Sequence, residues 1–146
     1  MDDAQNQPDS RTLARELALK LLYVTDISKP EQVETQLREV LEIEHASRDV
    51  SELASEIVAK VGELRTELDE DIQKVAVNWQ VSRMPVIDRA ILRMGVYELL
   101  YMHDIPPKVT INEGVELAKK YSTEKSGAFV NGLLDKIFQT RCPEKV

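Results

Sequence analysis

Two carboxylates, Asp88 and Glu98, lie in a stretch of the sequence that is otherwise mostly apolar. Paired carboxylates can act as a general acid and a general base. These two are ten residues apart, which is about 15 Å along a helix axis, so they cannot act on one small substrate from the same helix. We therefore favour structural roles in which each carboxylate meets an arginine or a helix end.

Other signatures of catalysis are missing from the sequence. His45 and His103 lie far apart, and neither has a second metal ligand near it. There is no glycine-rich phosphate loop, no His-x-x-x-His pair and no Gly-x-Ser-x-Gly motif. We expect no enzyme activity, no metal site and no cofactor.

Two pairs of arginines have a spacing that places both members on one helix face. One pair is Arg89 and Arg93, preceded by Asp88, and it could form an ion-pair network inside the protein or a surface for a partner. Arg11 and Arg15 form the second pair. Any solvated helix can carry such a pair, so the spacing alone is weak support for RNA binding.

Lysines gather around the start of the last predicted helix, at Lys119, Lys120 and Lys125. Backbone N–H groups at a helix start, together with lysines, can bind phosphate. Phe129 lies one turn beyond Lys125, with Ser126 on the same side, and an exposed aromatic ring there could stack on a base. Alternatively, Phe129 belongs to the core, as the apolar residues that follow it do.

Apolar residues recur at helical spacing along the chain, and no segment alternates as a strand does. We expect helices over about 11–26, 28–44, 49–64, 66–79, 86–102, 110–121 and 124–139. Ser10 is expected to cap the first helix, and Thr110 to open a capping box with Glu113. Trp79 continues an apolar stripe, and Gly132 is expected to let two helices approach closely.

The 146 residues predict one domain, with 42% hydrophobic and 31% charged residues. We expect a disordered acidic tail over 1–10, a single helical domain over 11–140 and a C-terminal tail over 141–146. The only cysteine, Cys142, excludes an intramolecular disulfide and fits a reducing cytoplasm. No segment is predicted to be a signal peptide or a membrane span.

The net charge of −7 argues against strong binding of nucleic acid. The charge is uneven, however. Residues 31–74 hold thirteen acidic and five basic residues, whereas residues 106–146 hold five acidic and seven basic residues. A modest basic surface is therefore compatible with the sequence.

Several ordered blocks of sequence together resemble the NusB family. The blocks are Asp88-Arg-Ala-Ile-Leu-Arg93, Tyr97-Glu-Leu99, Ile105-Pro-Pro-Lys-Val-Thr-Ile-Asn-Glu113, Val115-Glu-Leu-Ala-Lys119 and Phe129-Val-Asn-Gly-Leu-Leu-Asp-Lys136, with Arg15-Glu16 and Leu22-Tyr23 before them. The resemblance covers about 11–136 and is closest from Asp88 onward.

The resemblance implies an all-α fold, a compact bundle of about seven helices in two antiparallel helical subdomains. It implies a non-catalytic, cytoplasmic transcription antitermination factor that binds boxA-type single-stranded RNA of ribosomal RNA leader transcripts. The implied partners are the ribosomal protein NusE and the RNA polymerase elongation complex with other Nus factors, but no membrane. A homodimer is also possible.

The resemblance, with the lysine cluster, also assigns candidate residues. The RNA-binding candidates are Arg11, Arg15, Tyr23, Lys119, Lys120, Lys125, Ser126 and Phe129. The partner-binding candidates are Asp88, Arg89 and Arg93. The N-terminal basic segment of the family is denser in arginine than it is here, so weak RNA binding is expected without the protein partner.

Two other functions stay open. The chain could be a standalone relative of the NusB-like domain that is fused to ribosomal RNA cytosine methyltransferases, and so a targeting module for RNA modification. It could also be a protein-binding scaffold or homodimer with weak RNA affinity, which the acidic balance favours.

Overall fold

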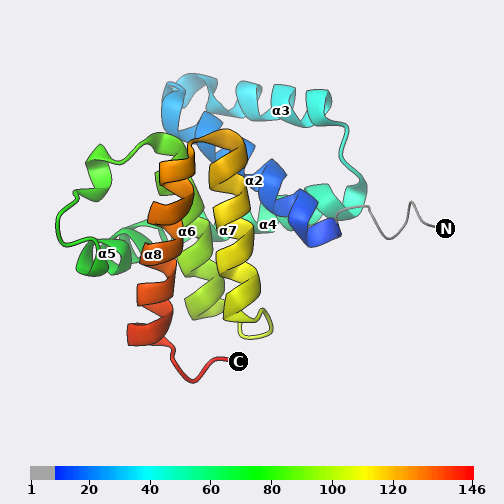
Figure 1. Ribbon diagram of the computed structural model, residues 1–146. Coiled ribbons are helices and arrows are strands. Elements are labelled where there is room, and N and C mark those ends of the chain that lie inside the picture. Colours follow the sequence, from blue (N-terminus) through cyan, green and yellow to red (C-terminus); the bar gives the residue numbers. More distant parts are fainter. Residues whose placement is uncertain (1–8) are drawn as a thin grey trace. The chain divides into compact units, whose positions relative to one another are not determined.

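Helices follow one another along the whole described chain, because apolar residues recur every three or four positions with few glycines between them (Figure 1). The computed structural model describes residues 9–146. The elements are α2 (Ser10–Ile27), η1 (Pro30–Gln32), α3 (Val33–Glu44), α4 (Arg48–Glu63), α5 (Arg65–Val75), η2 (Val81–Arg83), α6 (Val86–Tyr101), α7 (Pro107–Tyr121) and α8 (Glu124–Arg141). The described residues thus form seven α-helices and two short 3-10 helices with no strand, which confirms the all-α prediction.

The chain divides into two compact units, one ending at Ala59 and the other spanning Lys60–Val146. The boundary falls within α4. Most of the predicted acidic tail, residues 1–8, lies outside the described residues, so its disorder stays a prediction. The predicted division of the chain into tail, domain and tail likewise stays a prediction.

In the N-terminal unit, α2 and α3 pack against each other as an antiparallel pair. Lys20 in the middle of α2 forms an ion pair with Glu44 at the end of α3. Ser28, just after α2, donates through Oγ to Gln36 Oε1 near the start of α3 at 3.0 Å. The first contact joins the middle of α2 to the end of α3, and the second joins the end of α2 to the start of α3. The two helices are therefore antiparallel.

The start of α2 differs by one residue from the prediction. Ser10 is the first helical residue, and Asp9 is the N-cap, with Oδ1 accepting from the Thr12 backbone N–H at 2.8 Å. This hydrogen bond stabilises the charged carboxylate and lowers the pKa of Asp9.

In the C-terminal unit, α6 is the central helix and packs against α5, α7 and α8. Figure 1 shows α6, α7 and α8 side by side. Every residue from Ile91 to Leu99 is buried, as expected for a helix that is apolar on nearly all sides.

Glycines let α6 and α7 come close to α8. A Cβ atom added to Gly95 would lie 2.7 Å from Leu134 Cδ2, and one added to Gly114 would lie 3.2 Å from Leu134 Cδ1. Gly132, in contrast, is exposed and would have nothing within 4 Å of an added Cβ. The prediction of a close approach at Gly132 was therefore wrong, and Gly95 and Gly114 have that role.

The helix α7 begins earlier than predicted, at Pro107. Proline is favoured at the first position of a helix because its missing N–H would have no intrahelical partner there. Thr110 consequently lies inside the helix and does not cap it. It is 2% exposed and donates through Oγ1 to Oε1 of the buried Glu98 at 2.9 Å.

Two contacts of the C-terminal segment complete this unit. Arg141, at the end of α8, forms an ion pair with the buried Asp71 of α5. Lys145 donates through Nζ to the carbonyl oxygens of Glu98 and Leu99 near the end of α6, at 2.8 and 3.2 Å. Burial of its ammonium group lowers the pKa of Lys145.

Among the described residues, no helix combines the length and the apolar character that a membrane span requires.

Candidate nucleic-acid interface

The start of α8 is held in place by a cluster of hydroxyl groups. Thr123 is the N-cap, and its Oγ1 accepts from the Ser126 backbone N–H at 3.0 Å. Ser126 Oγ donates to Asp88 Oδ2 on α6 at 2.8 Å. Ser122 Oγ lies 2.9 Å from Ser126 Oγ. The backbone N–H groups of the first turn of α8 are therefore fixed by contacts that reach into the protein.

Ser126, a predicted RNA contact, is 7% exposed, and its hydroxyl is engaged in this cluster. It therefore acts in this structure as a link between α8 and α6. A contact between Ser126 and RNA stays a prediction.

Lysines surround this helix start. The Lys119 side chain from α7 lies against the first turn of α8, because its Cγ would be 3.2 Å from a Cβ added to Gly127. Lys125 is exposed in that first turn. Lys120 is exposed too, with Nζ 5.4 Å from the ring centroid of Tyr121. The positive end of a helix dipole and these ammonium groups favour a phosphate at the same place.

Phe129 lies one turn further along α8 and is half-buried. Its ring meets Trp79 in an edge-to-face contact, with the centroids 5.8 Å apart and the planes at 66°. Trp79 was predicted to continue the apolar stripe of the preceding helix. Instead α5 ends at Val75, and Trp79 lies in the following loop with 61% of its surface exposed.

The three N-terminal candidates lie on α2 in the other unit. Arg11 is half-buried and Arg15 is only 4% exposed, whereas Tyr23 is 37% exposed. Both arginines take part in interactions with other groups of the protein. Arg11 and Tyr23 thus offer more surface to a ligand than Arg15 does.

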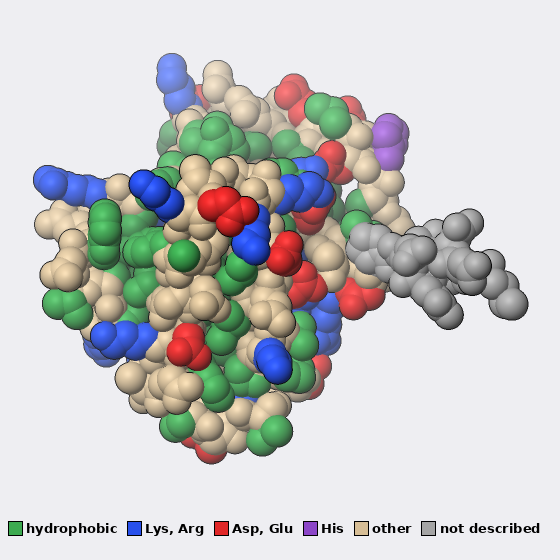
Figure 2. Space-filling model, viewed as in Figure 1, with side chains coloured by type: hydrophobic (Ala, Val, Ile, Leu, Met, Phe, Trp, Pro, Cys, Tyr) green, Lys and Arg blue, Asp and Glu red, His purple; other side chains and the backbone are tan. Residues whose placement is uncertain are grey.

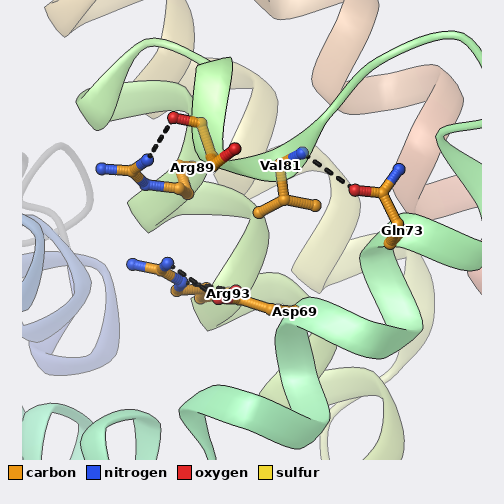
Figure 3. A network of polar contacts seen from close by, with 6 residues as sticks. Asp69, Gln73, Val81, Arg89 and Arg93 are labelled. Carbon is orange, nitrogen blue, oxygen red and sulfur yellow. Dashed lines mark hydrogen bonds and ion pairs between the residues drawn. The ribbon is translucent and has the colours of Figure 1, made fainter.

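The three partner-binding candidates lie on α6 and are largely inside the C-terminal unit. Arg93 is 6% exposed and makes a two-pronged ion pair with Asp69, from Nε at 2.7 Å and from Nη2 at 3.0 Å. Arg89 Nη1 donates to the Ser82 carbonyl oxygen at 3.2 Å (Figure 3). The arginine spacing thus produces an internal polar network that joins α6 to α5 and to η2.

Asp88 is 3% exposed. One of its carboxylate oxygens accepts from Ser126, and the other, Oδ1, is buried without a hydrogen-bond partner among the described residues. Asp88 therefore connects the predicted partner-binding helix to the predicted RNA-binding edge.

Figure 2 shows basic, acidic and apolar side chains interspersed on one face of the molecule. No group of three or more His, Cys, Asp or Glu side chains in residues 9–146 is arranged to hold a metal ion. The arrangement at α8 provides cations for phosphate and rings for stacking.

The fold defines an all-helical class of protein, and exposed lysines surround the start of its last helix. The NusB family model matches residues 12–139. The transcription antitermination protein NusB of Ruminiclostridium cellulolyticum is 45% identical over 135 residues, which cover 92% of this chain and 92% of that protein. The chain belongs to the NusB family.

Two solved structures agree with that assignment. NusB of T. maritima has a TM-score of 0.81 and 36% identity, over 94% of this chain and 95% of that chain. A crystal structure of the antitermination factors NusB and NusE in complex with double-stranded RNA has a TM-score of 0.77 and 32% identity, over 89% of this chain and 96% of that chain.

Proposed function

We propose that this protein is a non-catalytic transcription antitermination factor that acts in the cytoplasm and binds RNA together with the ribosomal protein NusE. The observation that carries the proposal is the start of α8, where Lys119 and Lys125 lie beside a rigid helix N-terminus and an aromatic pair follows one turn later. Cations and aromatic rings in this arrangement suit the backbone and bases of single-stranded RNA. Membership of the NusB family supports the same function.

In each unit, the candidate side chains that are exposed to solvent are the ones proposed to contact RNA. In the C-terminal unit, exposed Lys119, Lys120 and Lys125 bind phosphate, and Phe129 stacks on a base. In the N-terminal unit, Arg11 and Tyr23 make the larger contribution, because Arg15 is nearly buried. Ser126 contributes by holding the helix start in position.

The protein partner is proposed to contact the part of α6 that includes Asp88 and Arg89. Arg89 is half-buried and can be reached by a partner, whereas Asp88 is buried and acts on this surface by linking α6 to Ser126 of α8. Arg93 supports this surface from inside through its ion pair with Asp69.

The test is a titration of a boxA-like RNA, as a single strand and as a duplex, with and without NusE. Fluorescence anisotropy of the labelled RNA measures the affinity, and calorimetry measures NusE binding. We expect the single strand to bind more tightly than the duplex, and NusE to strengthen that binding. Asp88→Asn should weaken NusE binding, because the amide N–H₂ of asparagine donates at a position where a carboxylate oxygen accepts. Asp135→Asn, on the exposed side of α8, should leave NusE binding unchanged.

A second function is favoured by the net charge of −7, which opposes RNA binding by the isolated chain. In this alternative the protein is a protein-binding scaffold, a homodimer or a targeting module for RNA modification. Binding of NusE without any RNA affinity, at low salt and with the partner present, would support the alternative and contradict the proposed function.

A further inference from the structure

Trp79 is far more exposed than a tryptophan usually is. It lies in the loop between α5 and η2 with 61% of its surface accessible, and its neighbour Val77 is 76% exposed. Tryptophan is highly buried on average, because its large apolar surface is stabilised by removal from water. A ring left open in this way indicates a surface at which another molecule binds.

One side chain, that of Gln73, makes three hydrogen bonds to the backbone of the loop that carries Trp79. Gln73 Nε2 donates to the carbonyl oxygens of Ala76 and Trp79, at 3.1 and 2.7 Å. Gln73 Oε1 accepts from the Val81 backbone N–H at 3.0 Å (Figure 3). These three hydrogen bonds span the loop on both sides of Trp79 and support the backbone that presents the ring.

The contact of Trp79 with Phe129 leaves ring surface free. In an edge-to-face pair, the edge of one ring covers at most one face of the other. The centroids are 5.8 Å apart, yet Trp79 keeps 61% of its surface open and Phe129 is only half-buried. A third flat ring can therefore stack on this pair without moving it.

Charge near the pair favours a nucleic-acid base over a protein side chain. Lys125 is exposed one turn before Phe129 on α8, and Lys119 lies against the same helix start. Lysine is depleted at the centre of protein–protein interfaces. In sites for single-stranded nucleic acid, positively charged side chains bind the phosphate backbone beside the aromatic rings on which the bases stack.

We propose that Trp79 and Phe129 together form a stacking platform for one unpaired base of the bound RNA, with Gln73 as the residue that positions Trp79. The inference rests on the proposed function and adds Trp79, which lies 50 residues from Phe129 in sequence, to the RNA-binding site.

Trp79 is the only tryptophan of the chain, so the intrinsic fluorescence of the protein reports on this ring alone. The experiment titrates the boxA-like single strand and its duplex into the protein with NusE present, and follows both tryptophan fluorescence and RNA anisotropy. A NusE without tryptophan keeps the signal specific. Stacking of a base should quench the fluorescence in proportion to the bound single strand, and the duplex should not quench it.

Three variants accompany the titration. Trp79→Ala should weaken binding of the single strand by about 5- to 150-fold, since stacking of a base on an aromatic ring has about this effect. Trp79→Phe should recover most of the affinity. Val77→Ala, a change at an even more exposed apolar residue of the same loop, should leave the affinity unchanged.

The outcomes separate this inference from the proposed function. Normal RNA affinity for Trp79→Ala, or tight binding of the single strand without quenching, would overturn the platform and leave the proposed function standing. A loss of NusE affinity in Trp79→Ala without RNA would show that the surface binds protein, and would overturn it too. The absence of RNA binding by the unaltered protein with NusE would overturn both.

Discussion

Phe129 lies at the border between the core and the surface. It is half-buried on α8, next to the fully buried Val130, and its ring contacts the exposed Trp79. The ring therefore has an inner side that contributes to stability and an outer side that is available for binding.

Replacement of Phe129 by Ala should affect RNA affinity more than stability. We expect a loss of about 1–3 kcal/mol in binding of the single strand. The free energy of unfolding should fall by less than the about 3–5 kcal/mol that is typical of a fully buried phenylalanine. Anisotropy titration and urea denaturation measure the two quantities.

Phe138 provides the matched control, since it is the other phenylalanine and is also half-buried on α8. Phe138→Ala should lower stability without a specific loss of RNA affinity in the folded protein. If Phe129→Ala instead unfolds the protein and has normal affinity where it remains folded, Phe129 is a core residue.

The side chain of Asp9 determines where α2 begins, because Asp9 is the N-cap of this helix. The carboxylate accepts from the Thr12 N–H, and this hydrogen bond is the main cause of its lowered pKa, whereas burial opposes the shift. Since the folded pKa lies below the ordinary value of 3.8, the stabilisation is present above that value. It is lost as the pH falls through the folded pKa.

Asp9→Ala should therefore lower stability by about 0.5–2 kcal/mol at neutral pH, as removal of an N-cap usually does. The difference between the two proteins should shrink as the pH falls below 3.8. Asp9→Asn keeps a capping acceptor that does not titrate, so it should remain stable at neutral pH. Thermal melts followed by circular dichroism at several pH values measure the differences, and a pH-independent difference for Asp9→Ala would contradict this account.

The packing of α8 on α6 depends on the missing side chain of Gly95. An added Cβ would lie 2.7 and 2.8 Å from the two methyl groups of Leu134, which is fully buried. Gly95→Ala should therefore destabilise the protein, because overpacking costs about 1–3 kcal/mol and the better helix propensity of alanine returns at most about 1 kcal/mol.

Gly132→Ala on α8 is the matched control. Nothing lies within 4 Å of its added Cβ, so the same change should raise stability through helix propensity alone. Urea denaturation midpoints that move in the same direction for both variants would show that α6 and α8 are not in close contact at Gly95.

The helical elements could be predicted from the sequence because apolar periodicity is a property of each segment by itself. The break between α4 and α5 and the central position of α6 follow from the same pattern. Features that depend on neighbours in space could not be predicted. Thr110 fits a capping box as a pattern, but two prolines start the helix before it and the hydroxyl meets Glu98.

The candidate site shows the same division. Lysines at the start of α8 were visible in the sequence, as was the choice between core and surface for Phe129. Trp79 was missed because an apolar residue at helical spacing looks like the next residue of a stripe. Only the structure shows that α5 ends before it and that Gln73 holds the loop, so its exposure had no signal in the sequence.

The charge of the whole molecule sets the conditions under which RNA can bind. With a net charge of −7, the long-range field repels a polyanion, so binding depends on a few local cations. Each phosphate neutralised on a single strand contributes a slope of about −0.7 to the logarithm of affinity against the logarithm of salt concentration.

Arg11→Ala should therefore make this slope shallower by about 0.7 and weaken binding most at low salt. Arg38→Ala changes an exposed arginine on α3 that pairs with Glu34, and should leave the slope unchanged. RNA titrations with NusE at four salt concentrations give the slopes, and equal slopes for Arg11→Ala and the unaltered protein would remove Arg11 from the RNA-binding residues.

The ion pair between Asp71 and Arg141 has a consequence for the rate at which the protein unfolds. Its two residues are 70 positions apart, whereas α6, α7 and α8 follow one another with short connections. Contacts between distant parts of the chain close loops at a higher entropic cost, so this pair should form after the folding transition state. Arg141→Ala should then accelerate unfolding in stopped-flow experiments and leave the refolding rate nearly unchanged, and a slower refolding rate would place the pair within the transition state.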